Sequence, residues 1–235
     1  MDKFKQKVQD SSQFYNKSFL NFDYMLTEMN YLSLKPYFKG KNLLELGPAM
    51  GHMTKFLVND FENVSVVEGS KELLDLIPNY GNIEKHHSYF EEFETDKKFD
   101  TIIMSHVLEH IENPIKILKL ISRWLSENGV IIISVPNSKS LHRLAAVEMG
   151  LLESEYELNQ RDLDLGYYRV YDLNSLKKDI IESSLKIIDE GGVFLKPVSN
   201  GQIDDNWTDK MIDGFYKLGK KFPEFCAEIF VVCTK

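Results

Sequence analysis

Short apolar runs alternate with amphipathic stretches along most of the chain. The apolar runs predict strands at about 42–46, 63–68, 82–87, 99–104, 129–135, 186–195 and 226–234. The stretches near 51–60, 70–77, 114–125, 173–184 and 207–220 have the apolar spacing that is typical of helices. This alternation predicts an α/β fold with a Rossmann-like, doubly wound, mostly parallel seven-stranded sheet and helices on both faces. We expect the last strand to insert antiparallel.

Two segments lie outside this rhythm. Residues 1–38 are rich in aromatic side chains and predict an N-terminal helical cap. Residues 138–171 are too long for a simple connection and predict an insert or lid on the substrate side, with a helix at about 138–150. At 235 residues, the whole chain, 1–235, is expected to form one domain that carries both segments.

Composition narrows the class of protein. The formal net charge of −8 makes a nucleic-acid partner unlikely, because such proteins need a basic surface. No stretch approaches the roughly 20 apolar residues of a membrane span, and the N-terminus has no apolar core of a secretory signal. The two cysteines, Cys226 and Cys233, are expected to be buried thiols in a reducing compartment. We therefore expect a cytoplasmic protein with no membrane partner.

The most informative motif is a strand that ends in a turn of small residues and leads into a helix. The turn holds Gly47, Ala49 and Gly51 at every second position, and Glu68 ends the next strand. Glycines let the backbone approach a ligand, and an acid at the tip of the second strand suits the two hydroxyls of a ribose. The spacing departs from G-x-G-x-x-G, which favours an amino-acid-bearing nucleoside over a dinucleotide.

Four pieces of sequence together resemble the class I S-adenosylmethionine-dependent methyltransferases. They are the segment 45–51 (ELGPAMG), Glu68, the pair Phe99-Asp100 and the segment 105–114 (SHVLEHIENP). The last segment is similar to the small-molecule branch, which includes ubiquinone-biosynthesis and sugar methyltransferases. The resemblance covers roughly 40–137 well and departs from the family pattern at Ala49, where the family usually has its middle glycine.

The resemblance implies S-adenosylmethionine as the cofactor and assigns residues to it. The glycine turn would hold the methionine part, Glu68 the ribose and Phe90 the adenine, while Ser105 would lie beside the sulfonium. Tyr15 or Tyr24 could close over the methionine carboxylate, although each could also be a packing residue. The full set of cofactor-binding candidates is Glu45, Gly47, Pro48, Ala49, Gly51, Glu68, Phe90, Ser105, Tyr15 and Tyr24.

Three histidines are the candidates for chemistry at the acceptor. His106 and His110 are one helical turn apart after the fourth strand, and His142 follows the fifth. A hydroxyl acceptor must lose a proton, so a base is useful, whereas an amine needs less help. With Glu109 the three histidines could instead form a metal set, but Leu-Glu-His is common in the family without metal, and we assign no metal ligand.

The insert supplies candidates for acceptor binding, namely Arg143, Arg161, Tyr168 and Arg169. A guanidinium group fits a phosphate or a carboxylate, and tyrosine could stack on a sugar or ring. The alternative is an ordinary loop in which the arginines pair with neighbouring aspartates.

The sequence therefore predicts methyl transfer from S-adenosylmethionine to an oxygen or nitrogen of a small molecule, such as a sugar, a sugar nucleotide or a secondary metabolite. Two alternatives stay open. One is an RNA or protein methyltransferase, possibly metal-assisted, and the other is a non-catalytic, cofactor-binding partner subunit. A homodimer is possible.

Overall fold

The computed structural model describes residues 21–235. It begins with helix α2 (Asn21–Leu34), which is followed by a 3₁₀ turn, Lys35–Tyr37. The part of the expected N-terminal cap that the structure describes is thus helical. Tyr15, one of the cofactor-binding candidates, lies outside the described residues.

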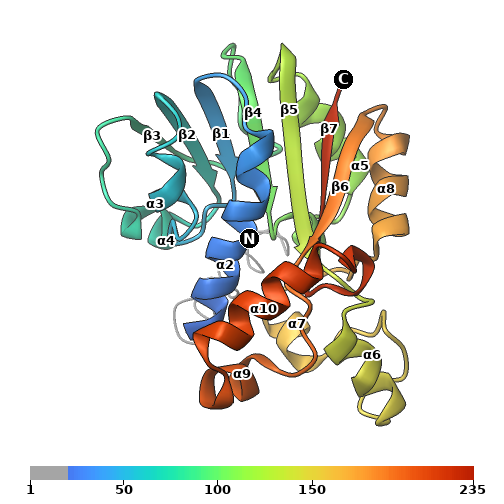
Figure 1. Cartoon of the computed structure of the whole chain (residues 1–235). Coiled ribbons are helices and arrows are strands. Elements are labelled where there is room, and N and C mark those ends of the chain that lie inside the picture. The colour runs from blue at the N-terminus through green and yellow to red at the C-terminus, as the bar shows by residue number, and fades with distance from the viewer. Residues whose placement is uncertain (1–20) are drawn as a thin grey trace.

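A seven-stranded sheet forms the centre of the described chain, with the order β3-β2-β1-β4-β5-β7-β6 (Figure 1). Strand β7 runs antiparallel to β5 and to β6, and the other pairs are parallel. The predicted fold class is confirmed. The strands are β1 (Asn42–Leu46), β2 (Asn63–Glu68), β3 (Ile83–His87), β4 (Phe99–Ser105), β5 (Leu125–Pro136), β6 (Lys186–Val193) and β7 (Glu228–Thr234).

Apolar side chains of the central strands alternate between two cores, one on each face of the sheet. Ile102 and Met104 of β4 belong to one cluster, and Ile103 belongs to the other. The first core includes residues of helices α5 (Pro114–Ser122) and α8 (Leu173–Glu182), and the second includes residues of α2 and α10 (Asp209–Gly219). Because both faces are covered, the strands read as nearly continuous apolar runs.

Most predicted helices are present with shorter bounds. The helix expected at 51–60 is only α3 (Thr54–Leu57), because Gly51 takes a left-handed φ of 79° and turns precede and follow the helix. Helix α4 is Lys71–Leu76, and the helix expected at 138–150 is α6 (Leu141–Glu148). None of the helices between residues 21 and 235 is long and apolar enough to span a bilayer.

Two short helices were not predicted. Helix α7 (Gln160–Asp164) lies in the insert, and α9 (Asn200–Asn206) follows β6. Each begins with a capping box, but each buries only one residue, so neither has the apolar period that reveals a helix. Cys226 and Cys233 are buried free thiols, as expected.

Candidate active site

A cavity of about 450 Å³ opens at the carboxyl edge of the sheet, where the strand order changes between β1 and β4. Ligands of open α/β sheets bind at such a switch point. Its wall includes residues of the glycine turn, the end of β4, the start of β7, helix α2 and the insert. The insert therefore forms part of the cavity wall, and its role as a lid stays a prediction.

The floor of the cavity is the glycine turn. Gly47, Ala49 and Gly51 have φ values of 66°, 49° and 79°, so all three lie in the left-handed region. A Cβ on Gly47 would lie 2.7 Å from a methyl group of Val107, which leaves no room for a side chain. Ala49 has a conformation that favours glycine, which explains why the family usually has glycine at this position.

We expect Ala49→Gly to stabilise the protein. A left-handed alanine costs about 1–2 kcal/mol, and the extra freedom of glycine in the unfolded chain returns about 0.5–1 kcal/mol of that. The melting temperature should therefore rise by about 2–4 °C in thermal unfolding. Ala145→Gly, inside helix α6, is the matched control and should lower it. A destabilised Ala49→Gly variant would contradict the strain assigned to this turn.

Glu68 lies at the tip of β2, as predicted, and its carboxylate holds the glycine turn. One oxygen accepts from the Ala49 N–H at 3.1 Å, and the other accepts from the Ser70 N–H at 2.8 Å. Burial raises the pKa of Glu68, and these backbone donors oppose the shift. Each carboxylate oxygen has a second lone pair, so both can still accept from ligand hydroxyls.

Glu45 is a second buried carboxylate, and it lines the cavity. It accepts from the Thr54 hydroxyl at 2.7 Å, and burial raises its pKa to about 7. No basic group of residues 21–235 forms an ion pair with it. A buried carboxylate without a cation is costly, so this end of the cavity favours a positively charged ligand.

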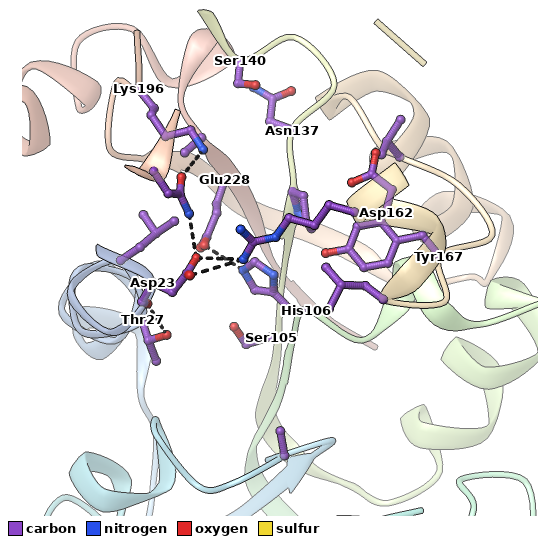
Figure 2. Close-up of a pocket in the computed structure, with 18 of the residues that line it drawn as sticks. Asp23, Thr27, Ser105, His106, Asn137, Ser140, Asp162, Tyr167, Lys196 and Glu228 are labelled. Atoms are coloured by element: carbon purple, nitrogen blue, oxygen red, sulfur yellow. Dashed lines mark hydrogen bonds and ion pairs between the residues drawn. The ribbon is translucent and has the colours of Figure 1, made fainter. Parts of the chain in front are cut away.

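His106 follows β4 and faces the cavity in a left-handed conformation, with a φ of 54°. Its Nε2 lies 2.7 Å from Oε1 of Glu228, and its Nδ1 lies 3.7 Å from Oε1 of Glu109. Burial alone would lower the pKa of His106, but the two carboxylates outweigh it and raise the pKa to about 9. His106 and Glu228 are drawn side by side in Figure 2.

Glu228 is a residue of the site that was not predicted from the sequence, and the sheet topology brings it there. Strand β7 is antiparallel, so its first residue lies opposite Pro136, the last residue of β5. The amino end of β7 therefore meets the carboxyl ends of the parallel strands. The sequence signal that could have identified Glu228 is a glutamate directly before the apolar run of the final strand.

Asn30 of α2 connects the helical cap to this edge and was also missed. Its side-chain nitrogen lies 3.2 Å from Oγ of Ser105 and 2.9 Å from Oγ of Ser134, and it also donates to Glu228. Ser105 lines the cavity as predicted, and its hydroxyl is 2.9 Å from that of Ser134. This buried network fixes the position of Glu228.

The other two histidines have different settings. His142 lines the cavity, but burial, with Lys196 and Arg143 nearby, lowers its pKa to about 2, so it is a weak base. The His110 ring packs edge-on against Tyr167, with centroids 4.8 Å apart. Within residues 21–235, no three His, Cys, Asp or Glu side chains are placed to hold a metal. Of the three candidates, His106 has the geometry of a base.

The three arginine candidates of the insert differ in how many hydrogen bonds their guanidinium groups already make within the protein. Arg143 lines the cavity, but it donates to Asp162 at 3.1 Å and to two backbone carbonyls of the insert. Arg169 donates to the carbonyls of Ile111 and Glu112, and it braces the loop after β4. Arg161 lines the cavity and bonds to Asp23.

Tyr168, the remaining candidate of the insert, lies outside the cavity wall of the described chain. Its N–H donates to the Glu109 carbonyl at 2.8 Å.

Two aromatic candidates for the cofactor lie near the cavity. Phe90 is partly buried against the first core, and its ring is close to Gly47. Tyr24 of α2 is 40% exposed and packs edge-on against His52, with ring centroids 4.5 Å apart. Pro48 lines the cavity. The contact of each with cofactor stays a prediction.

Comparison with known proteins identifies the family. A family model described as a methyltransferase domain matches residues 20–187, and the chain belongs to this family. The fold and this family together define a class I S-adenosylmethionine-dependent methyltransferase, and S-adenosylmethionine is its cofactor.

Individual relatives are distant. The chain is 23% identical over 197 residues to the ubiquinone biosynthesis O-methyltransferase of Rickettsia felis, covering 80% of this chain and 77% of that protein. It is 28% identical over 123 residues to the ribosomal RNA small subunit methyltransferase A of Francisella tularensis, covering 45% and 47%. The N-methyltransferase NodS of Bradyrhizobium japonicum, solved with S-adenosyl-L-homocysteine, has a TM-score of 0.60 at 13% identity, covering 99% and 98%.

Proposed function

We propose that the protein transfers the methyl group of S-adenosylmethionine to a hydroxyl oxygen of a small molecule bound in the cavity. The observation that carries this proposal is the His106–Glu228 pair in the cavity wall. A hydroxyl needs a base to take its proton, and a histidine oriented by a buried carboxylate is suited to that task.

The cofactor end of the cavity fits S-adenosylmethionine. The backbone of Gly47 and Ala49 is bare of large side chains, and Glu45 offers a cationic amine or sulfonium a carboxyl group that no basic side chain of residues 21–235 pairs with. Glu68, which bonds to Ala49, would accept the ribose hydroxyls. The bound cofactor supplies an already activated methyl group, so the protein's main tasks are to place the acceptor and to take its proton.

The proton of the acceptor hydroxyl would pass to Nδ1 of His106. Nε2 is committed to Glu228, which fixes the orientation of the ring. Glu109 lies 3.7 Å from Nδ1, is fully buried and stabilises the imidazolium once it forms. Burial raises the pKa of Glu109 to about 7, so this support increases as the pH rises through neutrality.

Three features support a small acceptor over RNA or protein. The cavity is bounded by α2 on one side and by the insert on the other, and its volume of about 450 Å³ suits a ligand of modest size. The net charge of −8 opposes contact with a phosphate backbone. Ser105 ends β4 and His106 follows it, in place of the Asn-Pro-Pro-Tyr motif of base-amino methylation. A homodimer stays a prediction.

Turnover with methyl-labelled S-adenosylmethionine tests the proposal. The acceptors would be a panel of phenols, sugars and amines, with bulk RNA and protein as competing acceptors. We expect label on the oxygen of one hydroxyl compound, and no label in RNA or protein. Label confined to macromolecules or to amines would contradict oxygen transfer to a small molecule.

A further inference from the structure

Most charged side chains that line the cavity are already paired with one another. Each of three carboxylates faces one cation, at 3.2, 3.1 and 2.7 Å: Asp23 with Arg161, Asp162 with Arg143, and Glu228 with His106. After this pairing, two charged groups of opposite sign are left over within the described wall. They are Glu45, beside the glycine turn, and Lys196.

Lys196 is a buried cation without a carboxylate partner. It follows β6 and is only 8% exposed, yet no carboxylate oxygen of residues 21–235 lies within 4 Å of its Nζ. Its hydrogen bond goes to the neutral side-chain oxygen of Asn200, at 2.6 Å. Burial lowers the pKa of Lys196 to about 8, so it is still largely charged at neutral pH. Arg161 adds to this lowering of the pKa, which is opposed by the more distant carboxylates of Asp23, Glu228 and Asp162. Lysine is almost never buried in this way without a partner.

A second polar group near Lys196 also lacks a partner. The Ser140 side chain is fully buried and lines the cavity, but its hydroxyl bonds to nothing within the described chain. Such groups are normally satisfied, so an orphaned hydroxyl on a cavity wall indicates a missing ligand. Figure 2 shows Lys196 and Ser140 at the top of the view, with His106 and Ser105 close together near its centre.

Arg161 extends the positive character of this end. Its side chain is 41% exposed, and only one of its guanidinium nitrogens bonds to Asp23. Within residues 21–235 the other guanidinium nitrogens bond to no further group, so they can serve a second acceptor. Asn200 also donates to Asp23, at 2.6 Å, so that this carboxylate is bonded to both Asn200 and Arg161.

We propose that Lys196 and Ser140, with Arg161 at the margin, form a subsite for an anionic oxygen group, a carboxylate or a phosphate, of the methyl acceptor. This inference rests on the proposed function and names the class of acceptor. The anion would be anchored at this end, so that a hydroxyl elsewhere on the same molecule reaches His106. The unpaired Glu45 leaves the opposite end to the cationic cofactor, so charge alone would orient the two ligands.

Calorimetry with matched phenols tests the subsite without requiring turnover. The probes are hydroquinone, 4-hydroxybenzoate, 4-hydroxyphenyl phosphate and inorganic phosphate, each titrated into protein saturated with S-adenosylhomocysteine. The wild type should bind at least one of the two anionic phenols about tenfold or more tighter than hydroquinone, because bonds to charged groups contribute about 1.5–3 kcal/mol. The stronger of the two identifies carboxylate or phosphate as the natural group.

Lys196→Met should remove this preference while the affinity for S-adenosylhomocysteine stays near that of the wild type. Ser140→Ala should reduce it by a smaller factor, and this variant keeps the test valid if Lys196→Met does not fold. Lys217→Met, on the exposed surface of α10, is the matched control and should change nothing. In the wild type, the preference should fall as the pH rises above about 8, where Lys196 loses its proton.

Two results would overturn the subsite. One is a wild type that binds inorganic phosphate and both anionic phenols no better than hydroquinone. The other is a Lys196→Met variant that keeps the full preference, which would make Lys196 a structural tie to Asn200. Failure of the proposed function is recognised separately: anion binding would then persist, but no phenol would be methylated.

Discussion

Replacing His106 with asparagine should lower the rate of methyl transfer by about 10²–10⁴-fold, the usual contribution of a general base. Asparagine is the informative substitution because His106 has a φ of 54°, and asparagine tolerates the left-handed region better than most residues. The affinity for S-adenosylmethionine, measured by calorimetry, should stay within a few-fold of the wild type. His86→Asn, on the edge strand β3, is the matched control and should leave both quantities unchanged.

The pH dependence gives a second readout of the same pair. His106 must be neutral to take a proton, and its pKa is raised to about 9. The rate should therefore rise with pH, with its midpoint near pH 9, and level off above that value. Glu228→Gln removes the charge that causes most of the upward shift, so the rising limb should move toward lower pH. Two results would exclude His106 as the base. One is a wild-type rate of methyl transfer in His106→Asn, and the other is a pH–rate profile of Glu228→Gln whose rising limb stays where it is in the wild type.

Glu68→Ala should weaken the binding of S-adenosylmethionine by roughly 10–100-fold, because a charged acceptor contributes about 1.5–3 kcal/mol per bond. The same substitution removes the acceptor of the Ala49 and Ser70 N–H groups, so the protein should also melt earlier. Glu62→Ala is the matched control. It lies just before β2, at the far end of that strand, where its carboxylate pairs with Lys41 at the surface.

An analogue of S-adenosylhomocysteine without the ribose 2′-hydroxyl separates the two effects. The wild type should bind it more weakly than the parent compound, whereas Glu68→Ala should no longer distinguish the two ligands. If the variant still discriminates as strongly as the wild type, Glu68 only braces the turn and does not contact the ribose.

The parts of the fold that could be predicted are those encoded by local pattern. Strands such as Asn63–Glu68 were predicted at their observed bounds, because a short apolar run between polar segments is typical of a buried strand. The antiparallel last strand was expected and is present. Helices α7 and α9 were missed because their stability comes from caps and not from an apolar period. The helix expected at 51–60 was too long because the left-handed Gly51 delays its start and a turn follows Leu57.

Residues of the candidate site could be predicted only where they lie close together in the sequence. The glycine turn and Glu68 fall within one strand-helix-strand unit, so their spacing was informative. Glu228, Asn30 and Lys196 are distant in the sequence from the motifs, and only the sheet order and the packing of α2 bring the first two to one edge. Arg169 illustrates the opposite error, since an arginine suited to an anion instead braces backbone carbonyls.

The antiparallel insertion of β7 also sets the order in which the site can be made during synthesis. The cofactor turn and Glu68 lie within residues 45–68, whereas Glu228 enters with the last strand of the sheet to be translated. Because folding begins on segments that have already emerged, the cofactor half of the site can form well before the partner of His106 exists. A nascent chain could thus complete the cofactor turn early but acquire last the carboxylate that orients its proton acceptor, His106.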